Sequence, residues 1–160
     1  MPYKNFWMKM TKTLVPYVLR GMDENDKAFI YTTWIKVHWT APPMNFCDKT
    51  SYLPHQREVI TKLLDTANVL VACDPDDSDS LLGYIVYEFV AGVLIVHWLH
   101  IKSINRFMHL ASDILETIYP NHRTRTIICT QNFMEYSKLR YKFKLSYDPF
   151  FLMDRMRGIH

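Results

Sequence analysis

The chain has 160 residues, of which 49% are hydrophobic and 14% aromatic, and its formal net charge is +3. This length and composition suffice for one packed core, so we expect a single domain over residues 1–160. No apolar run approaches the roughly 20 residues of a membrane-spanning helix, and the first residues lack the apolar stretch of a secretion signal. We therefore expect a soluble cytoplasmic protein, and the small net charge argues against nucleic acid as a partner.

The sequence lacks the short motifs of common metal and nucleotide sites. Its three cysteines, Cys47, Cys73 and Cys129, lie far apart without Cys-x-x-Cys spacing. We therefore expect free buried thiols and no metal. There is no His-Glu-x-x-His, no Gly-x-Ser-x-Gly and no glycine-rich Walker loop. These absences argue against hydrolases and nucleoside triphosphatases.

The first part of the chain is predicted to form one strand and two helices. A short strand over 17–20 precedes a helix that Asp23 caps and that reaches Val37. An irregular connection over 40–52 leads to a second amphipathic helix over 53–67.

The next segments predict the centre of a sheet. A continuous apolar run over 68–73 is typical of a strand, and the Asp-rich cluster at 74–79 is typical of an exposed turn. Residues 80–90 and 93–102 flank an Ala-Gly pair, which predicts a β-hairpin. Their apolar density indicates central strands covered on both faces.

The rest of the chain predicts two helices and two more strands. Apolar residues recur at helical spacing from Arg106 onward, and a strand follows over 124–130. From Asn132 we expect a helix that stops near Lys142, where apolar and basic residues alternate and the chain extends. Residues 149–156, rich in aromatics, predict a final strand, which gives the order β α α β β β α β α β.

The segment Arg-Phe-Met-His-Leu-Ala, from Arg106 to Ala111, follows the second hairpin strand. In this context it resembles the Gln/Arg-x-x-Gly-x-Gly/Ala signature of the GNAT superfamily of acyl-CoA-dependent N-acyltransferases, with His109 at the first glycine. Leu82-Gly83-Tyr84-Ile85 resembles the family's third strand, and the resemblance spans roughly 17–157. It implies an α/β (α+β) fold with a mixed central sheet of about six to seven strands and about four helices.

The resemblance also implies a function and a cofactor site. The expected activity is transfer of acetyl from acetyl-CoA to an amine of a protein or small molecule. The family holds the pantetheine arm on the fourth strand and the pyrophosphate at the following helix N-terminus, where free N–H groups and the helix dipole favour anions. The residues that this assigns to acetyl-CoA are Leu99, His100, Ile101, Arg106, Phe107, Met108, His109, Leu110, Ala111 and Asn132.

His109 opens a second interpretation. Glycine lets a backbone approach phosphate closely, whereas the Cβ and imidazole of a histidine obstruct that approach, although the imidazole could itself donate to phosphate. The alternative is therefore a catalytically inactive GNAT-fold module that binds a protein partner as an inhibitor or adaptor.

His97 is the candidate general base. In a regular strand the odd separation of His97 and His100 places them on opposite faces, with His97 beside Ile95 and Leu99. Many family members place a base on this face, and an ordinary histidine pKa suits that role. A hydrogen-bonded core histidine is the alternative, and Glu88 is either a second base candidate or a surface charge at a strand end.

Tyr141 is the candidate general acid. It lies one position past the place of the family's tyrosine, which Arg140 occupies here. A register shift would bring Tyr141 or Tyr136 to the leaving thiolate, and aromatic core packing is the alternative for both.

Two further segments carry open alternatives. Lys138, Arg140, Lys142 and Lys144 suit nucleic acid, the CoA phosphates, or a solvated charged surface balanced by Glu135 and Asp148. Aromatic residues from Trp34 to Tyr52, including His38 and Trp39, fall where the family's acceptor site varies. They either shape a substrate cleft or pack the first helix.

Overall fold

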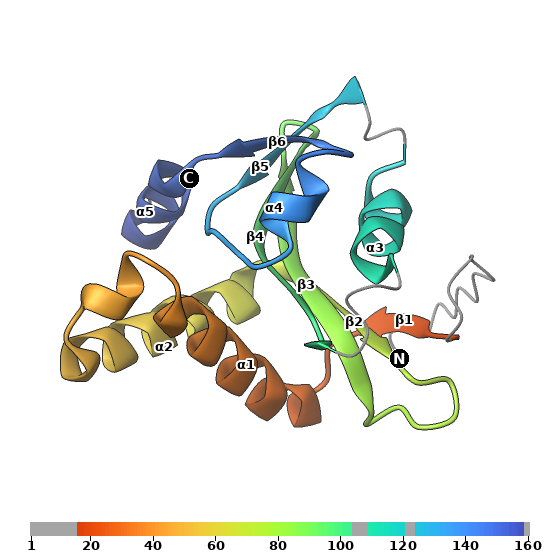
Figure 1. Cartoon of the computed structure of the whole chain (residues 1–160), viewed down its shortest axis with the longest axis horizontal. Coiled ribbons are helices and arrows are strands. Elements are labelled where there is room, and N and C mark those ends of the chain that lie inside the picture. The colour runs from red at the N-terminus through yellow and green to blue at the C-terminus, as the bar shows by residue number, and fades with distance from the viewer. Residues whose placement is uncertain (1–15, 104–108, 121–123, 159–160) are drawn as a thin grey trace.

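The computed structural model describes residues 16–103, 109–120 and 124–158. These residues form one six-stranded mixed sheet and the helices packed against it (Figure 1). The strands lie in the order β1-β2-β3-β4-β5-β6. Strands β1 to β4 are antiparallel to one another in succession, whereas β5 runs parallel to β4 and β6 runs parallel to β5. The prediction of a mixed α/β sheet of about six strands is confirmed.

The first half of the described chain contains β1 (Val18–Gly21), the 3-10 turn η1 (Glu24–Asp26), α1 (Lys27–Thr40), η2 (Met44–Phe46) and α2 (Lys49–Thr66). Asp23 accepts a hydrogen bond from the backbone of Asn25, and Asp26 accepts one from the backbone of Asp23, which together cap this start. Asp48 caps α2 by accepting from the backbone N–H of Ser51. For this reason α2 begins earlier than predicted, and the irregular connection is shorter.

The central hairpin forms as predicted from β3 (Leu81–Val90) and β4 (Val93–Ile101), with β2 (Asn68–Cys73) beside β3. Ala91 and Gly92 both have positive φ, 50° and 77°. Two positive φ values give a turn whose twist matches that of the strands it joins. Nearly every residue of β4 is buried, so both of its faces are covered.

The second half contains α3 (Leu110–Ile118), β5 (Thr126–Cys129), α4 (Tyr136–Leu139), β6 (Lys144–Tyr147) and α5 (Pro149–Arg157). A short helix followed by an extended segment confirms the prediction for residues after Asn132. Helix α3 is described from Leu110, with His109 at its N-cap. Residues Arg106, Phe107 and Met108 lie outside the described residues.

The prediction of a final strand over 149–156 is wrong, because this segment is helix α5. Asp148 accepts hydrogen bonds from the backbone N–H groups of Phe150 and Phe151, and Pro149 occupies the first helical position. Gly158, with a φ of 73°, ends the helix. These caps outweigh the strand preference of the aromatic residues, so the described chain has five α-helices instead of about four.

The helices cover the two faces of the sheet unequally. Helices α1, α2 and α5 lie on one side and α3 lies on the other (Figure 1). The Nζ of Lys62 in α2 donates to the carbonyl of Met156 in α5 at 2.7 Å. On this face Trp34 of α1 stacks on Trp98 of β4, with ring centroids 5.2 Å apart and both side chains fully buried. None of the helices in the described ranges is both long enough and apolar enough to cross a membrane.

Strand β4 contains one more residue than β3 across part of their pairing. Val86 lies opposite Trp98, whereas its successor on β3 lies opposite Val96. His97 is the extra residue between them and forms a β-bulge.

The bulge overturns the prediction that His97 and His100 point to opposite faces. The ring of His97 lies 6.3 Å from that of Phe151 in α5, and the ring of His100 lies 6.0 Å from that of Phe29 in α1. Both helices cover the same face of the sheet (Figure 1). Because an extra residue shifts the alternation by one, Leu99 points away from this face, and its predicted grouping with His97 is also wrong.

The expectation of free buried thiols is confirmed for two of the three cysteines. All three are free, and Cys73 and Cys129 are buried, but Cys47 is exposed.

Candidate functional site

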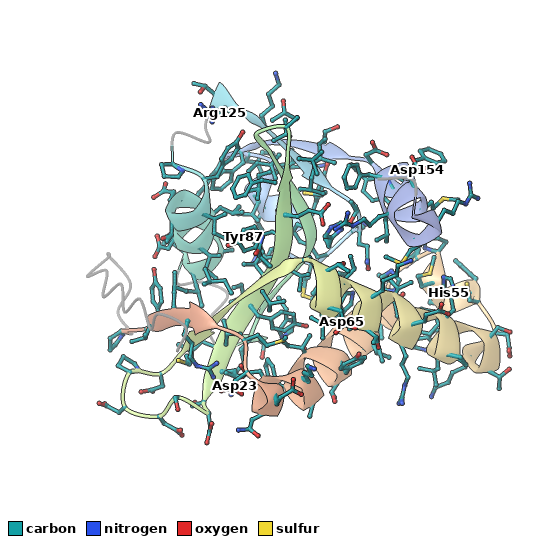
Figure 2. The ribbon with its side chains drawn as sticks, turned by 180° about the vertical axis from the view of Figure 1, so that it is seen from behind. Asp23, His55, Asp65, Tyr87, Arg125 and Asp154 are labelled. Carbon is teal, nitrogen blue, oxygen red and sulfur yellow. The ribbon has the colours of Figure 1, made fainter. Side chains whose placement is uncertain are left out.

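A cavity of about 620 Å³ lies between α1, α2, α4 and α5, beside the carboxyl end of β5. This volume is within the range of small-molecule sites. Figure 2 shows His55 of α2 and Asp154 of α5 on the same side of the molecule, whereas Tyr87 of β3 lies toward α3. The described lining residues are His38, Ala41, Pro42, Pro43, Met44, Tyr52, His55, Gln56, Val59, Thr130, Gln131, Asn132, Tyr136, Ser137, Arg140, Tyr147, Pro149, Leu152 and Met153.

Helices α1 and α2 contribute an uncharged histidine–tyrosine pair. The Nδ1 of His38 lies 2.8 Å from the hydroxyl of Tyr52. Burial lowers the pKa of His38 to about 4 and raises the pKa of Tyr52, so both groups are neutral near pH 7. Either the tyrosine hydroxyl donates to Nδ1, or the tautomer protonated at Nδ1 donates to the hydroxyl oxygen. These two residues line the cavity, whereas Trp34 is buried in the core beneath it.

The carboxyl end of β5 contributes three polar residues in succession, Thr130, Gln131 and Asn132. The indole N–H of Trp34 donates to Oε1 of Gln131 at 3.1 Å. This bond fixes the orientation of the amide, because an indole is only a donor. Asn132, assigned to the cofactor by the resemblance, is exposed and lies beside the cavity.

His97 lies next to this segment but is not among the lining residues. Its side chain is fully buried, and Nδ1 lies 2.9 Å from Oγ1 of Thr130, which does line the cavity. On the other side of the ring, Nε2 lies 3.4 Å from a carboxylate oxygen of Glu88. The structure therefore connects His97 to a lining residue of the cavity through the hydroxyl of Thr130.

Glu88 is not the surface charge that its strand-end position suggested. It is 7% exposed, and the guanidinium of Arg155 lies 3.1 Å from its carboxylate. A buried carboxylate requires such a partner. Arg155 belongs to α5, so the incorrectly predicted strand concealed this interaction.

Within the described residues, β4 pairs with β5 only near its own beginning, where it meets the last two residues of β5. Ile95 and Val96 lie opposite Ile128 and Cys129, and the backbone N–H of Thr130 donates to the carbonyl of Val96 at 3.1 Å. Beyond this point β4 continues to Ile101, whereas the chain after β5 turns toward the cavity. Leu99, His100 and Ile101, the residues assigned to the pantetheine arm, are all buried in this diverging part of β4.

The start of α3 lies beside the basic segment. His109 precedes the helix with a φ of 57°, in the left-handed region that glycine adopts most easily. Its Nδ1 accepts from the Nζ of Lys142 at 3.2 Å. Leu110 is buried and Ala111 half-buried in the first helical turn. The structure thus brings a lysine of the basic segment to the predicted phosphate position.

The two tyrosines have different locations. Tyr141 is 80% exposed, accepts a hydrogen bond from Arg140 at 3.2 Å and is not among the lining residues. Tyr136 is half-buried and lines the cavity, and burial raises its pKa. The four basic side chains of this segment are exposed, but Glu135, expected to balance them in solvent, is buried.

Sequence reasoning missed Thr130, Gln131 and the contribution of α5. A signal for the first two exists, since Thr-Gln-Asn follows directly after a buried strand of a parallel pair. Side chains at the carboxyl ends of parallel strands commonly bind ligands.

The comparisons with known proteins bear on the fold. No family model and no curated protein matches the chain. Among solved structures, a proposed acetyl transferase from Pyrococcus furiosus is 15% identical, with 89% of this chain and 91% of that chain covered and a TM-score of 0.52.

Two further structures match less closely. An integron cassette protein from V. cholerae is 13% identical, covering 78% of this chain and 81% of that chain, with a TM-score of 0.45. An aminoglycoside 6'-N-acetyltransferase from Acinetobacter baumannii is 13% identical, covering 90% of each chain, with a TM-score of 0.38. The likeness to the Pyrococcus protein and the mixed six-stranded sheet agree with the sequence resemblance, and the chain has a GNAT-like fold.

Proposed function

We propose that the protein is an N-acetyltransferase that moves acetyl from acetyl-CoA to an amine. The observation that carries this proposal is the divergence of β4 from β5 directly beside a cavity of ligand size. A strand that loses its neighbour has backbone available for an extended ligand, and the adjacent cavity can hold the second substrate.

The residues near this divergence fit acetyl-CoA. The backbone of Leu99 to Ile101 would hold the pantetheine arm, and the first turn of α3, with Ala111, would face the pyrophosphate. Lys142, which contacts His109, supplies a cation at the same place. Bound acetyl-CoA supplies an activated thioester, which an amine can attack directly.

His97 would receive the proton of the amine through Thr130. The carboxylate of Glu88 near Nε2 favours the tautomer with the proton on that nitrogen, which leaves Nδ1 as an acceptor for the hydroxyl of Thr130. A proton can then pass from the amine to the hydroxyl oxygen of Thr130 while the hydroxyl proton moves to Nδ1. Arg155 holds Glu88 in its place.

Tyr136 is better placed than Tyr141 to protonate the leaving thiolate. It lines the cavity, and burial raises its pKa, so its phenol remains protonated at neutral pH. Tyr141 would require a rearrangement of α4 to reach the same position.

One observation favours the alternative of an inactive binding module. His109 places a side chain at the left-handed position immediately before α3, where a glycine would leave the backbone open. On this alternative the protein binds no acetyl-CoA, and the fold serves another partner.

Release of free CoA from acetyl-CoA, followed with a thiol reagent in the presence of a panel of amines, tests the activity. We expect Lys142→Gln to raise the KM for acetyl-CoA with little change in kcat, because an exposed phosphate contact contributes to binding alone. Lys36→Gln, on the exposed side of α1, is the matched control. Thr130→Val should lower kcat and Thr130→Ser should restore it. Equal rates for the valine and serine variants would exclude the hydroxyl as a proton carrier.

A further inference from the structure

The described residues that line the cavity include a positively charged side chain but no negatively charged one. None of the described residues that line it is acidic, whereas Arg140, whose guanidinium lies over the ring of the exposed Tyr141, is a lining residue. His38 of α1 and Tyr52 of α2 form an uncharged pair in the same lining. A ligand with several positive charges would lose its hydration here without gaining a carboxylate partner.

Two buried amides supply hydrogen-bond donors to the same cavity. Gln56 and Gln131 are 4% and 5% exposed, and both line it. Within the described part of the chain, the Nε2 atom of each has no hydrogen-bond partner. For Gln131 the orientation is fixed, because Oε1 accepts from Trp34 and only the NH₂ group remains. Buried donors without a partner are costly, so a ligand oxygen that accepts from them would bind favourably.

The rest of the cavity is apolar or aromatic. Met44, Val59, Leu152 and Met153 are lining residues, together with prolines and tyrosines. An apolar ligand body gains free energy when these side chains exclude water from it.

We infer that the cavity binds a small molecule with an apolar body and an anionic oxygen group. The proposed transferase requires that this molecule is also a primary amine, which gives the chemistry of a hydrophobic α-amino acid. The anionic oxygens meet Arg140 and the amide donors, and the apolar body meets the methionine and leucine side chains. That this ligand is the acetyl acceptor rests on the proposed function. An uncharged wall also lowers the pKa of a bound amine through desolvation, which favours the neutral nucleophile.

The test uses the full chain without acetyl-CoA, titrated with L-phenylalanine, 2-phenylethylamine and spermidine. Binding is measured by thermal shift and by the fluorescence of the tryptophans under the cavity. We expect L-phenylalanine to bind at least tenfold more tightly than either amine that lacks a carboxylate, because hydrogen bonds to a charged group are strong.

Two variants of lining residues, one exposed and one buried, locate the site, and a third variant outside the cavity is the control. Arg140→Gln, at an exposed position, should weaken L-phenylalanine about tenfold and leave 2-phenylethylamine unchanged. Lys144→Gln removes the same charge outside the cavity and should change neither. Gln131→Glu retains an oxygen acceptor for Trp34 but replaces the donor with a carboxylate, so it should reverse the preference between the two ligands.

The outcomes separate this inference from the proposed function. Tighter binding of spermidine than of L-phenylalanine, no binding of any ligand at millimolar concentration, or equal effects of Arg140→Gln and Lys144→Gln would each overturn it. A parallel titration with acetyl-CoA reports on the transferase independently. Amino-acid binding without acetyl-CoA binding would support the site and refute the enzyme, whereas the converse would refute the ligand class alone.

Discussion

Replacing His38 with glutamine should change how stability depends on pH. In the unfolded chain this histidine takes up a proton near its ordinary pKa of 6.5, whereas burial lowers the pKa in the folded protein to about 4. Between these values the unfolded state binds more protons, so the free energy of unfolding falls as the pH falls. One pKa unit corresponds to about 1.4 kcal/mol, and partial solvent exposure reduces the effect, so the loss between pH 7 and pH 4 is about 2–3 kcal/mol.

Urea denaturation followed by tryptophan fluorescence at pH 7, 6, 5 and 4 measures this loss. The glutamine amide can accept from or donate to the hydroxyl of Tyr52, so His38→Gln removes the titration with little change in packing. The stability advantage of the wild type over the variant should shrink by about 2–3 kcal/mol between pH 7 and pH 4. His55→Gln, at an exposed lining position, controls for the loss of a histidine. Parallel pH curves for wild type and His38→Gln would refute a buried neutral imidazole.

Two further predictions concern the sheet beneath the site. Gly83→Ala should destabilise the protein by about 1–3 kcal/mol in urea denaturation, since its Cβ would lie 2.7 Å from a backbone oxygen of β4. Gly21→Ala, where no atom lies within 4 Å, is its control, and an equal effect at both positions would contradict the close approach. Arg155→Met should cost about 2–3 kcal/mol, because it leaves the buried carboxylate of Glu88 without this cation, and adding Glu88→Gln should restore part of the loss. A double variant no more stable than the single one would argue against that ion pair.

Much of the sheet could be predicted from the sequence because its strands are continuous apolar runs with clear boundaries. The hairpin of β3 and β4 is the best example, since an Ala-Gly pair separates its two apolar runs and Gly92 readily adopts a positive φ. Helix α5 could not be predicted from the same evidence. Its aromatic residues favour a strand, and the deciding interactions are local caps from Asp148 and Gly158.

The candidate site was harder to predict, because it depends on pairing between distant segments. The bulge at His97 arises from the register of β4 against β3, which the strand's own sequence does not specify. Glu88 and Arg155 meet only because α5 packs on the sheet. The cavity likewise combines residues of α1 and α2 with residues that follow β5. The spacing of apolar residues within one helix or strand does not indicate which distant side chains come into contact.

Calorimetric titration of the protein with acetyl-CoA tests the central claim most directly. We predict saturable binding that Lys142→Gln weakens and that His109→Gly strengthens, because glycine accepts the left-handed backbone and leaves the start of α3 open. Weaker binding by His109→Gly would show that the imidazole itself contacts the phosphates. No heat and no thermal shift at millimolar acetyl-CoA would contradict the transferase and support a binding module with the same fold.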